Sequence, residues 1–124
     1  MKSRHDPRHK KRQQIVKELF AQSFSDQKVG ETAQKIIDQS TTLDQKIGDS
    51  APAWPIQKLN KIDLAILRLA TYEIEKTDTP PKVIIDEAVE LAKEFGSENS
   101  PSFINGVLGD LLLKHEESNS KNQI

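Results

Sequence analysis

The side chains best suited to chemistry are three histidines, a group of carboxylates and a run of cations at the N-terminus. His5, His9 and His115 lie near the chain ends, where a histidine is more often solvated than catalytic. His115 precedes Glu116 and Glu117, a spacing that does not place three metal ligands on one helix face. The sequence therefore predicts no catalytic histidine and no metal site.

The carboxylates Asp86, Glu87 and Glu90 could act as a catalytic pair, since Asp86 and Glu90 share one helix face. No metal partner or pocket motif accompanies them, so the solvated edge of an amphipathic helix explains them better. The chain has no cysteine, which excludes disulfides, thiolate metal sites and cysteine nucleophiles. It also lacks the GxSxG, Walker, Rossmann and EF-hand patterns. We predict that the protein is not an enzyme and uses no cofactor.

Positive charge is concentrated in the first 20 residues, where seven basic residues against two acidic ones give +5, so the remaining 104 residues carry −6. This asymmetry predicts a basic arm, residues 1–12, for a polyanion, although a basic tail that only aids solubility explains the composition equally well. Asp6-Pro7 predicts a helix start. Cations in the first turns of that helix oppose its dipole, at a cost of about 0.3–1 kcal/mol each. Their placement therefore favours a binding function.

The elements that carry these groups are predicted to be helices, because apolar residues recur at helical spacing along most of the chain. The expected elements are a first helix from Pro7, a second over about residues 31–40, a short helical turn and loop over 41–55, a central helix over 61–76, a helix ending at Phe95 before Gly96, and a last helix from Ser100. They predict one domain over residues 1–115, followed by a disordered polar tail over 116–124.

The central segment, residues 61–76, has almost no polar face, so other helices must surround it. Arg68 and Glu73 lie within it, and each needs a partner from another helix. Trp54, which lies between prolines, is predicted to anchor the core. Gly106 and Gly109 are predicted to let a neighbouring helix approach the last helix closely.

No apolar stretch approaches the roughly 20 residues needed to cross a bilayer. The basic N-terminus is not followed by the apolar segment of a secretory signal. We therefore expect a cytoplasmic protein with no membrane partner.

Two motifs, in order and at matching spacing, resemble the NusB family. The first is Trp54 followed by KIDLAILRLATYEI at residues 61–74, and the second is PKVIIDEAVELAKEFG at 81–96, then Ser100 and FINGVL at 103–108. The resemblance is tight over residues 54–112 and looser over the first helix. It implies an all-α fold, a compact bundle of about six to seven helices in two small subdomains. It also implies a role in transcription antitermination during ribosomal RNA synthesis.

The resemblance further implies two binding surfaces. One would bind boxA-type single-stranded RNA through the basic arm and the turn before the last helix. Its residues here are Arg4, Arg8, Lys10, Lys11, Arg12, Asn99, Ser102 and Phe103. The other would face a small-subunit ribosomal protein, also called NusE, through Phe20 and Asp63. Other antitermination factors and RNA polymerase would be indirect partners, and a homodimer is compatible with such folds.

The sequence departs from the family pattern in ways that bear on binding more than on the fold. The region before Trp54 is short by about one helix, which predicts a reduced N-terminal subdomain. Lysine and histidine replace part of the arginine-rich start, and these side chains lack the bidentate phosphate geometry of arginine. Phe20 replaces a common tyrosine, and Ser102 stands where a basic residue is frequent.

Two other functions remain open from the sequence. A protein-only helical scaffold would use the basic arm on an acidic partner and bind RNA feebly. A detached RNA-binding module, like the one that precedes a ribosomal RNA cytosine methyltransferase, would assist a separate enzyme. Salt-sensitive binding to a particular RNA, strengthened by the ribosomal protein, would distinguish the antitermination factor from both.

Overall fold

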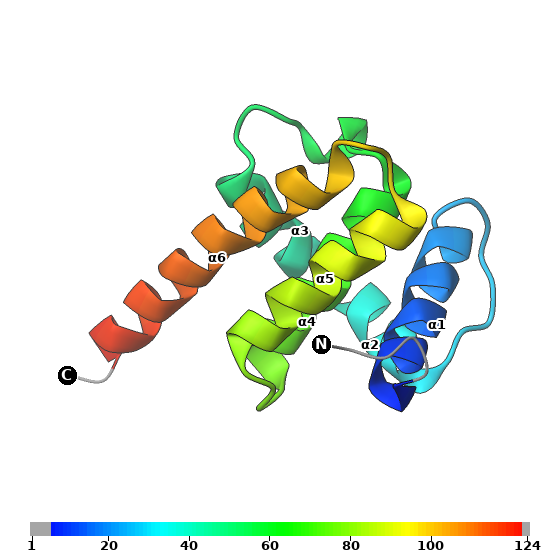
Figure 1. Cartoon of the computed structure of the whole chain (residues 1–124), viewed down its shortest axis with the longest axis horizontal. Coiled ribbons are helices and arrows are strands. Elements are labelled where there is room, and N and C mark those ends of the chain that lie inside the picture. The colour runs from blue at the N-terminus through cyan, green and yellow to red at the C-terminus, as the bar shows by residue number, and fades with distance from the viewer. Residues whose placement is uncertain (1–5, 123–124) are drawn as a thin grey trace.

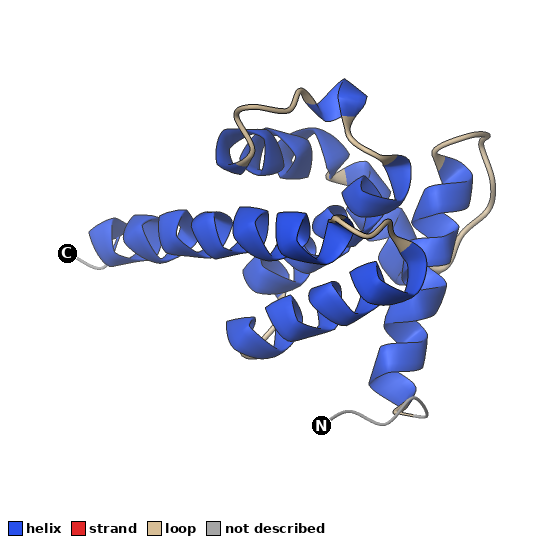
Figure 2. Ribbon diagram, turned by 45° about the horizontal axis from the view of Figure 1, so that its top comes forward, coloured by secondary structure: helices blue, strands red, loops and turns tan. Residues whose placement is uncertain are grey.

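The computed structural model describes residues 6–122, in which every regular element is a helix (Figure 1; Figure 2). In chain order the elements are α1 (Pro7–Gln22), α2 (Glu31–Asp38), α3 (Ser40–Ser50), the short 3₁₀ helix η1 (Ile56–Lys58), α4 (Lys61–Lys76), α5 (Pro81–Phe95) and α6 (Ser100–Asn122). The predicted all-α class is therefore confirmed. None of these described helices is long and apolar enough to span a bilayer.

Helix α4 is the centre of the bundle and contacts α1, α2, α3, α5 and α6. Its residues Ile66 and Leu67 are fully buried, as the nearly complete apolar surface of this segment predicted. Arg68, one of its charged residues, finds the partner that the sequence called for. Arg68 donates two hydrogen bonds to the Asp44 carboxylate on α3, at 2.7 and 2.6 Å. The buried cluster that α4 shares with its neighbours is continuous.

Helix α3 occupies residues 40–50, where the sequence predicted only a short helical turn and a loop. Leu43 and Ile47 are buried on its inner face. Their burial outweighs the cost of Gly48, which lowers helix propensity by about 1 kcal/mol relative to alanine. The helix ends at Ser50, two residues before Pro52. The sequence therefore underestimated the helical content before α4.

Trp54 is 55% exposed, so the prediction that it anchors the core is wrong. The segment between α3 and α4 runs over the surface, where its prolines leave few backbone donors to satisfy. Ala51 and Leu59, at the two ends of this segment, are the residues that enter the core. The indole of Trp54 therefore lies outside the core, although its size had suggested that it would be buried there.

Helix α6 continues to Asn122, through most of the segment predicted to be a disordered tail; residues 123–124 lie outside the described part. Its C-terminal half projects away from the other helices (Figure 1; Figure 2). Pairs four residues apart support this exposed stretch: Lys114 lies 3.1 Å from Asp110, and Asn119 lies 3.2 Å from His115. Local pairing thus continues the helix beyond the last buried residue.

Candidate nucleic-acid interface

The described part of the basic arm starts at a capped helix end. Asp6 is the N-cap of α1 and accepts a 2.9 Å hydrogen bond from the backbone N–H of Arg8, as predicted. Arg8, Lys10 and Lys11 are exposed, and the first turn of α1 holds no acidic residue. Arg8 also lies 3.1 Å from the Asp6 carboxylate. Arg4, the other arginine predicted for this surface, lies outside the described residues.

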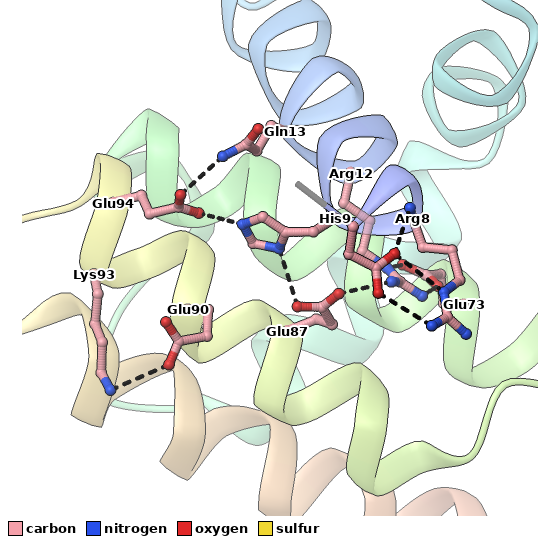
Figure 3. A network of polar contacts seen from close by, with 10 residues as sticks. Arg8, His9, Arg12, Gln13, Glu73, Glu87, Glu90, Lys93 and Glu94 are labelled. Atoms are coloured by element: carbon pink, nitrogen blue, oxygen red, sulfur yellow. Dashed lines mark hydrogen bonds and ion pairs between the residues drawn. The ribbon is translucent and has the colours of Figure 1, made fainter. Parts of the chain in front are cut away.

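Arg12, also predicted as an RNA contact, bonds carboxylates on α4 and α5 (Figure 3). Its Nε and Nη2 donate to the two oxygens of Glu73 on α4, at 2.9 and 2.7 Å. Its Nη1 donates to Glu87 on α5 at 3.0 Å. Only 11% of the Arg12 side chain is exposed. The guanidinium is therefore engaged in the interior and leaves little for a phosphate to contact.

His9 is buried, so the prediction that the histidines are solvated is wrong for this one. Its Nδ1 lies 3.0 Å from Glu87 Oε2, and its Nε2 lies 2.7 Å from Glu94 Oε1 (Figure 3). Burial by itself lowers the pKa of His9, but the hydrogen bonds to Glu94 and Glu87 outweigh it, and the net pKa is raised. Gln13 donates to the second oxygen of Glu94 at 2.8 Å.

Together, these side chains fasten the start of α1 to α4 and α5. His9, Arg12 and Val16 follow one another at helical spacing on the buried face, while Lys10 and Lys11 lie on the exposed face. The sequence offered one signal for this arrangement, because residues 9, 12 and 16 continue the apolar stripe of α1 backwards. The exposed cations Lys10 and Lys11 therefore lie on turns of α1 whose opposite face is attached to α4 and α5 by the contacts of His9 and Arg12.

The second predicted part of the RNA surface is the turn between α5 and α6. Asn99 and Ser102 are exposed, while Phe103 is half-buried and packs against the core. Lys17, two turns along α1 from the arm, lies 5.8 Å from the centre of the Phe95 ring at the end of α5. Lys17 therefore extends the positive charge of α1 towards this turn.

The turn between α5 and α6 is tightly packed at Gly96. A Cβ at this position would lie 2.6 Å from the Ser100 Cβ and 2.9 Å from the Ala92 carbonyl oxygen. Ser100 is fully buried and cannot move away easily. We expect Gly96→Ala to lower the free energy of unfolding by about 1–3 kcal/mol in urea denaturation, because it overpacks the turn.

Gly106 provides the control for that substitution. Apart from the adjoining residues and the backbone of α6 itself, no atom would lie within 4 Å of a Cβ at Gly106 or Gly109, so the prediction that these glycines allow a close helix approach is wrong. Gly106→Ala is expected to raise the free energy of unfolding by about 0.5–1 kcal/mol through helix propensity. If the two alanine variants had equal stability, the steric argument for Gly96 would fail.

The residues predicted to face a protein partner lie at the end of α1 and the start of α4. Phe20 is half-buried and meets Phe24 edge to face, with ring centres 5.0 Å apart. Phe24 is 63% exposed, and Lys61 Nζ lies 5.4 Å from its ring centre. Phe24 was not singled out from the sequence, although it ends the apolar stripe of α1 four residues after Phe20. We call Phe20, Phe24 and Lys61 the aromatic patch.

Asp63 is buried beneath this region rather than displayed on it. It is 7% exposed, and its Oδ1 has no hydrogen-bond partner among the described residues. Burial raises the pKa of Asp63, and a hydrogen bond with Ser100 opposes the shift only in part. The carboxyl group therefore lies between the starts of α4 and α6, where direct contact with a partner would require it to become exposed.

Comparison with known proteins identifies the family. A sequence model of the NusB family matches residues 2–112. The chain belongs to the NusB family. Among solved structures, NusB of T. maritima superimposes with a TM-score of 0.74 at 32% identity, covering 90% of this chain and 92% of that one.

Curated members of the family match the chain over a shorter range. The transcription antitermination protein NusB of Clostridium novyi is 49% identical over 71 residues, which cover 56% of this chain and 53% of that protein. Its counterpart in Roseiflexus sp. (strain RS-1) is 46% identical over 83 residues, which cover 64% and 58%. The chain thus spans between half and three-fifths of the length of these relatives. Within residues 6–122, no group of three or more histidine, aspartate or glutamate side chains is arranged so that it could hold a metal ion.

Proposed function

We propose that this chain is an RNA-binding transcription antitermination factor that binds boxA-type RNA together with a small-subunit ribosomal protein, NusE, during ribosomal RNA transcription. Its curated relatives carry the name transcription antitermination protein. The observation that carries the RNA-binding part is the exposed row of Arg8, Lys10 and Lys11 at the start of α1. These cations interact unfavourably with the positive end of the helix dipole. A polyanion bound at this end would offset that unfavourable free energy.

The proposed RNA surface combines phosphate contacts with base contacts. Lys10 and Lys11 supply affinity through phosphates without reading the sequence. Sequence selection on single-stranded RNA requires bases to stack and to be read at their edges, for which Asn99, Ser102 and Phe103 in the next turn are candidates. Arg4 stays in the proposal, whereas Arg12 is left out because its guanidinium is bound to Glu73 and Glu87.

The aromatic patch is the proposed surface for the ribosomal protein. Exposed aromatic rings beside a cation are typical of the residues that carry binding energy in protein interfaces. Phe20 and Phe24 offer such a pair, with Lys61 against one ring. The patch lies at the opposite end of α1 from the basic arm, so RNA and protein could bind the same helix without competing.

The deciding experiment measures binding of a boxA-like RNA and a scrambled RNA, alone and with the ribosomal protein, at rising salt. Preference for the boxA-like RNA that increases with the partner is the expected result. Weak and equal binding to both RNAs would overturn the proposal and favour a protein-only scaffold. Selective binding that the ribosomal protein does not change would favour a detached RNA-binding module.

A paired substitution tests the contribution of the arm. We expect Lys10→Gln with Lys11→Gln to weaken RNA binding and to make the slope of log K against log salt shallower by about 1.4, because each lysine neutralises one phosphate of a single strand. Far-ultraviolet circular dichroism should not change, since both side chains are exposed. The matched control, Lys28→Gln with Lys58→Gln, removes the same charge from two exposed lysines outside the arm. An unchanged slope in the arm variant would remove these lysines from the interface.

A further inference from the structure

The hydrogen bonds of His9 define its protonation state. Nδ1 faces Glu87 at 3.0 Å and Nε2 faces Glu94 at 2.7 Å. An ionised carboxylate can only accept hydrogen bonds, so both ring nitrogens must donate, and only the imidazolium form carries a proton on each. The geometry therefore calls for a charged His9 beneath the basic arm.

We propose that His9 is a positioning residue, whose second proton docks the start of α1 on α5 and thereby holds the RNA-binding arm in place. RNA affinity would then fall as pH rises and His9 loses this proton. The inference rests on the proposed RNA-binding function for its consequence, but the docking itself can be measured without RNA.

The groups around His9 explain why the proton matters. Helix α1 contributes Arg12 and Gln13, α4 contributes Glu73, and α5 contributes Glu87 and Glu94. Glu90, between the last two on α5, is paired with Lys93 at 3.3 Å and faces away from His9 (Figure 3). With His9 charged, its imidazolium and the Arg12 guanidinium bond the three carboxylates, and Arg8 adds a longer-range attraction for Glu87. Without its proton, Arg12 still bonds Glu73 and Glu87, but Glu94 no longer faces an imidazolium and the excess negative charge repels.

The effect is concentrated at the arm because only polar side chains, those of His9, Arg12 and Gln13, hold that part of α1. The buried residues of α1 are His9, Ile15, Val16 and Leu19, so no apolar side chain anchors the first two turns. Arg8, Lys10 and Lys11 lie on these same two turns. Loss of the His9 contacts would leave Arg12 and Gln13 as the remaining attachments of these turns and would loosen them, while the later, apolar part of α1 stays packed.

The direction of the pH dependence follows from the raised pKa of His9. Its ordinary value is 6.5, and the folded value lies above this. The stabilisation is therefore fully present below about 6.5, where the unfolded chain is also protonated, and is lost as pH rises through the folded pKa. Docking of the arm should weaken as the pH rises through the folded pKa, above 6.5, and should not weaken through His9 as the pH falls below 6.5.

The first test uses the full chain without RNA. Nitrogen NMR of the imidazole should show His9 protonated on both nitrogens at pH 6. Hydrogen-exchange protection of the α1 amides around Lys10 to Gln14 should fall as His9 titrates, while protection around Val16 and Leu19 stays. Titration of His9 with no change in protection would overturn the proposal.

Four variants assign the effect to the proton. His9→Gln, which has no charge, should show low protection at every pH. His9→Arg, which keeps its charge, should stay protected up to pH 9. Glu94→Gln removes one of the two carboxylates that raise the pKa of His9, so the loss of protection in this variant should occur at lower pH than in the parent. Glu90→Gln, one turn away and paired with Lys93, is the matched control and should behave as the parent.

Binding of the boxA-like RNA over the same pH range gives the functional result. If docking falls to about a tenth of the molecules, the apparent affinity of the parent should drop about tenfold, whereas His9→Arg should show no such drop. A drop of equal size in His9→Arg would overturn the role of His9 and leave RNA binding intact. If the protection of α1 changes with the protonation of His9 but the chain binds no RNA, the proposed function would be overturned and the docking role of His9 would be confirmed.

Discussion

Arg12→Ala should lower the free energy of unfolding by about 3–5 kcal/mol, because it removes the cation that bonds the buried carboxylates of Glu73 and Glu87. Arg12 bonds both oxygens of Glu73 and one oxygen of Glu87. The side chains of Glu73 and Glu87 are only 11% and 3% exposed. Water can therefore replace little of what the guanidinium supplied. Urea denaturation at pH 7, followed by circular dichroism, measures the effect.

Two comparisons separate this pairing from a general loss of charge on α1. Lys11→Ala, one residue earlier and exposed, should change the free energy of unfolding by less than about 0.5 kcal/mol. The deficit of Arg12→Ala should also shrink in acid, because a buried carboxylate with fewer cations beside it takes up a proton more readily. A deficit near that of Lys11→Ala, or one that does not depend on pH, would contradict the interior role of Arg12.

The helices were predictable because local sequence patterns indicate both where they begin and end and which of their faces is buried. Asp6-Pro7 starts α1, Gly96 follows the end of α5, and α4 is central because its segment is apolar almost all round. Helix α3 was underestimated because Gly48 suggested a break, whereas burial of Leu43 and Ile47 on α4 and α6 decides the conformation. Tertiary packing overrides propensity there.

The candidate site was predicted less well, because it depends on which distant residues meet. The same run of cations contains both kinds of side chain: Lys10 and Lys11 point outward, while Arg12 meets Glu73 and Glu87 from 61 and 75 residues further along the chain. Composition cannot separate these roles. Helical periodicity could have done so, since position 12 lies on the buried face of α1.

His9 shows why position in the chain is a poor guide to exposure. A histidine close to the N-terminus was expected to be solvated. Its two ring nitrogens instead contact Glu87 and Glu94, which lie two turns apart on the same face of α5. Trp54 shows the converse, because the prolines around it keep its segment on the surface despite the size of the indole. Both errors arise from judging one residue without the helix that packs against it.

Phe24→Ala should weaken binding of the small-subunit ribosomal protein by about 2 kcal/mol or more, roughly thirtyfold, while the fold is preserved. Phe24 is 63% exposed and rests on Phe20, so the free protein loses little packing when the ring is removed. A partner that covers the ring would bury most of its surface, and the substitution would remove that gain. Titration calorimetry with the purified ribosomal protein measures the difference.

Trp54→Ala is the matched control, because Trp54 is the other largely exposed aromatic side chain among residues 6–122. It lies in the loop between α3 and α4 and not in the aromatic patch, so its removal should leave the affinity for the ribosomal protein unchanged. Equal losses for the two variants would indicate a non-specific preference for exposed rings. A loss confined to Trp54→Ala would move the partner surface to that loop, away from Phe20 and Phe24. Only a loss confined to Phe24→Ala places the partner at the end of α1, where it can bind while RNA occupies the other end.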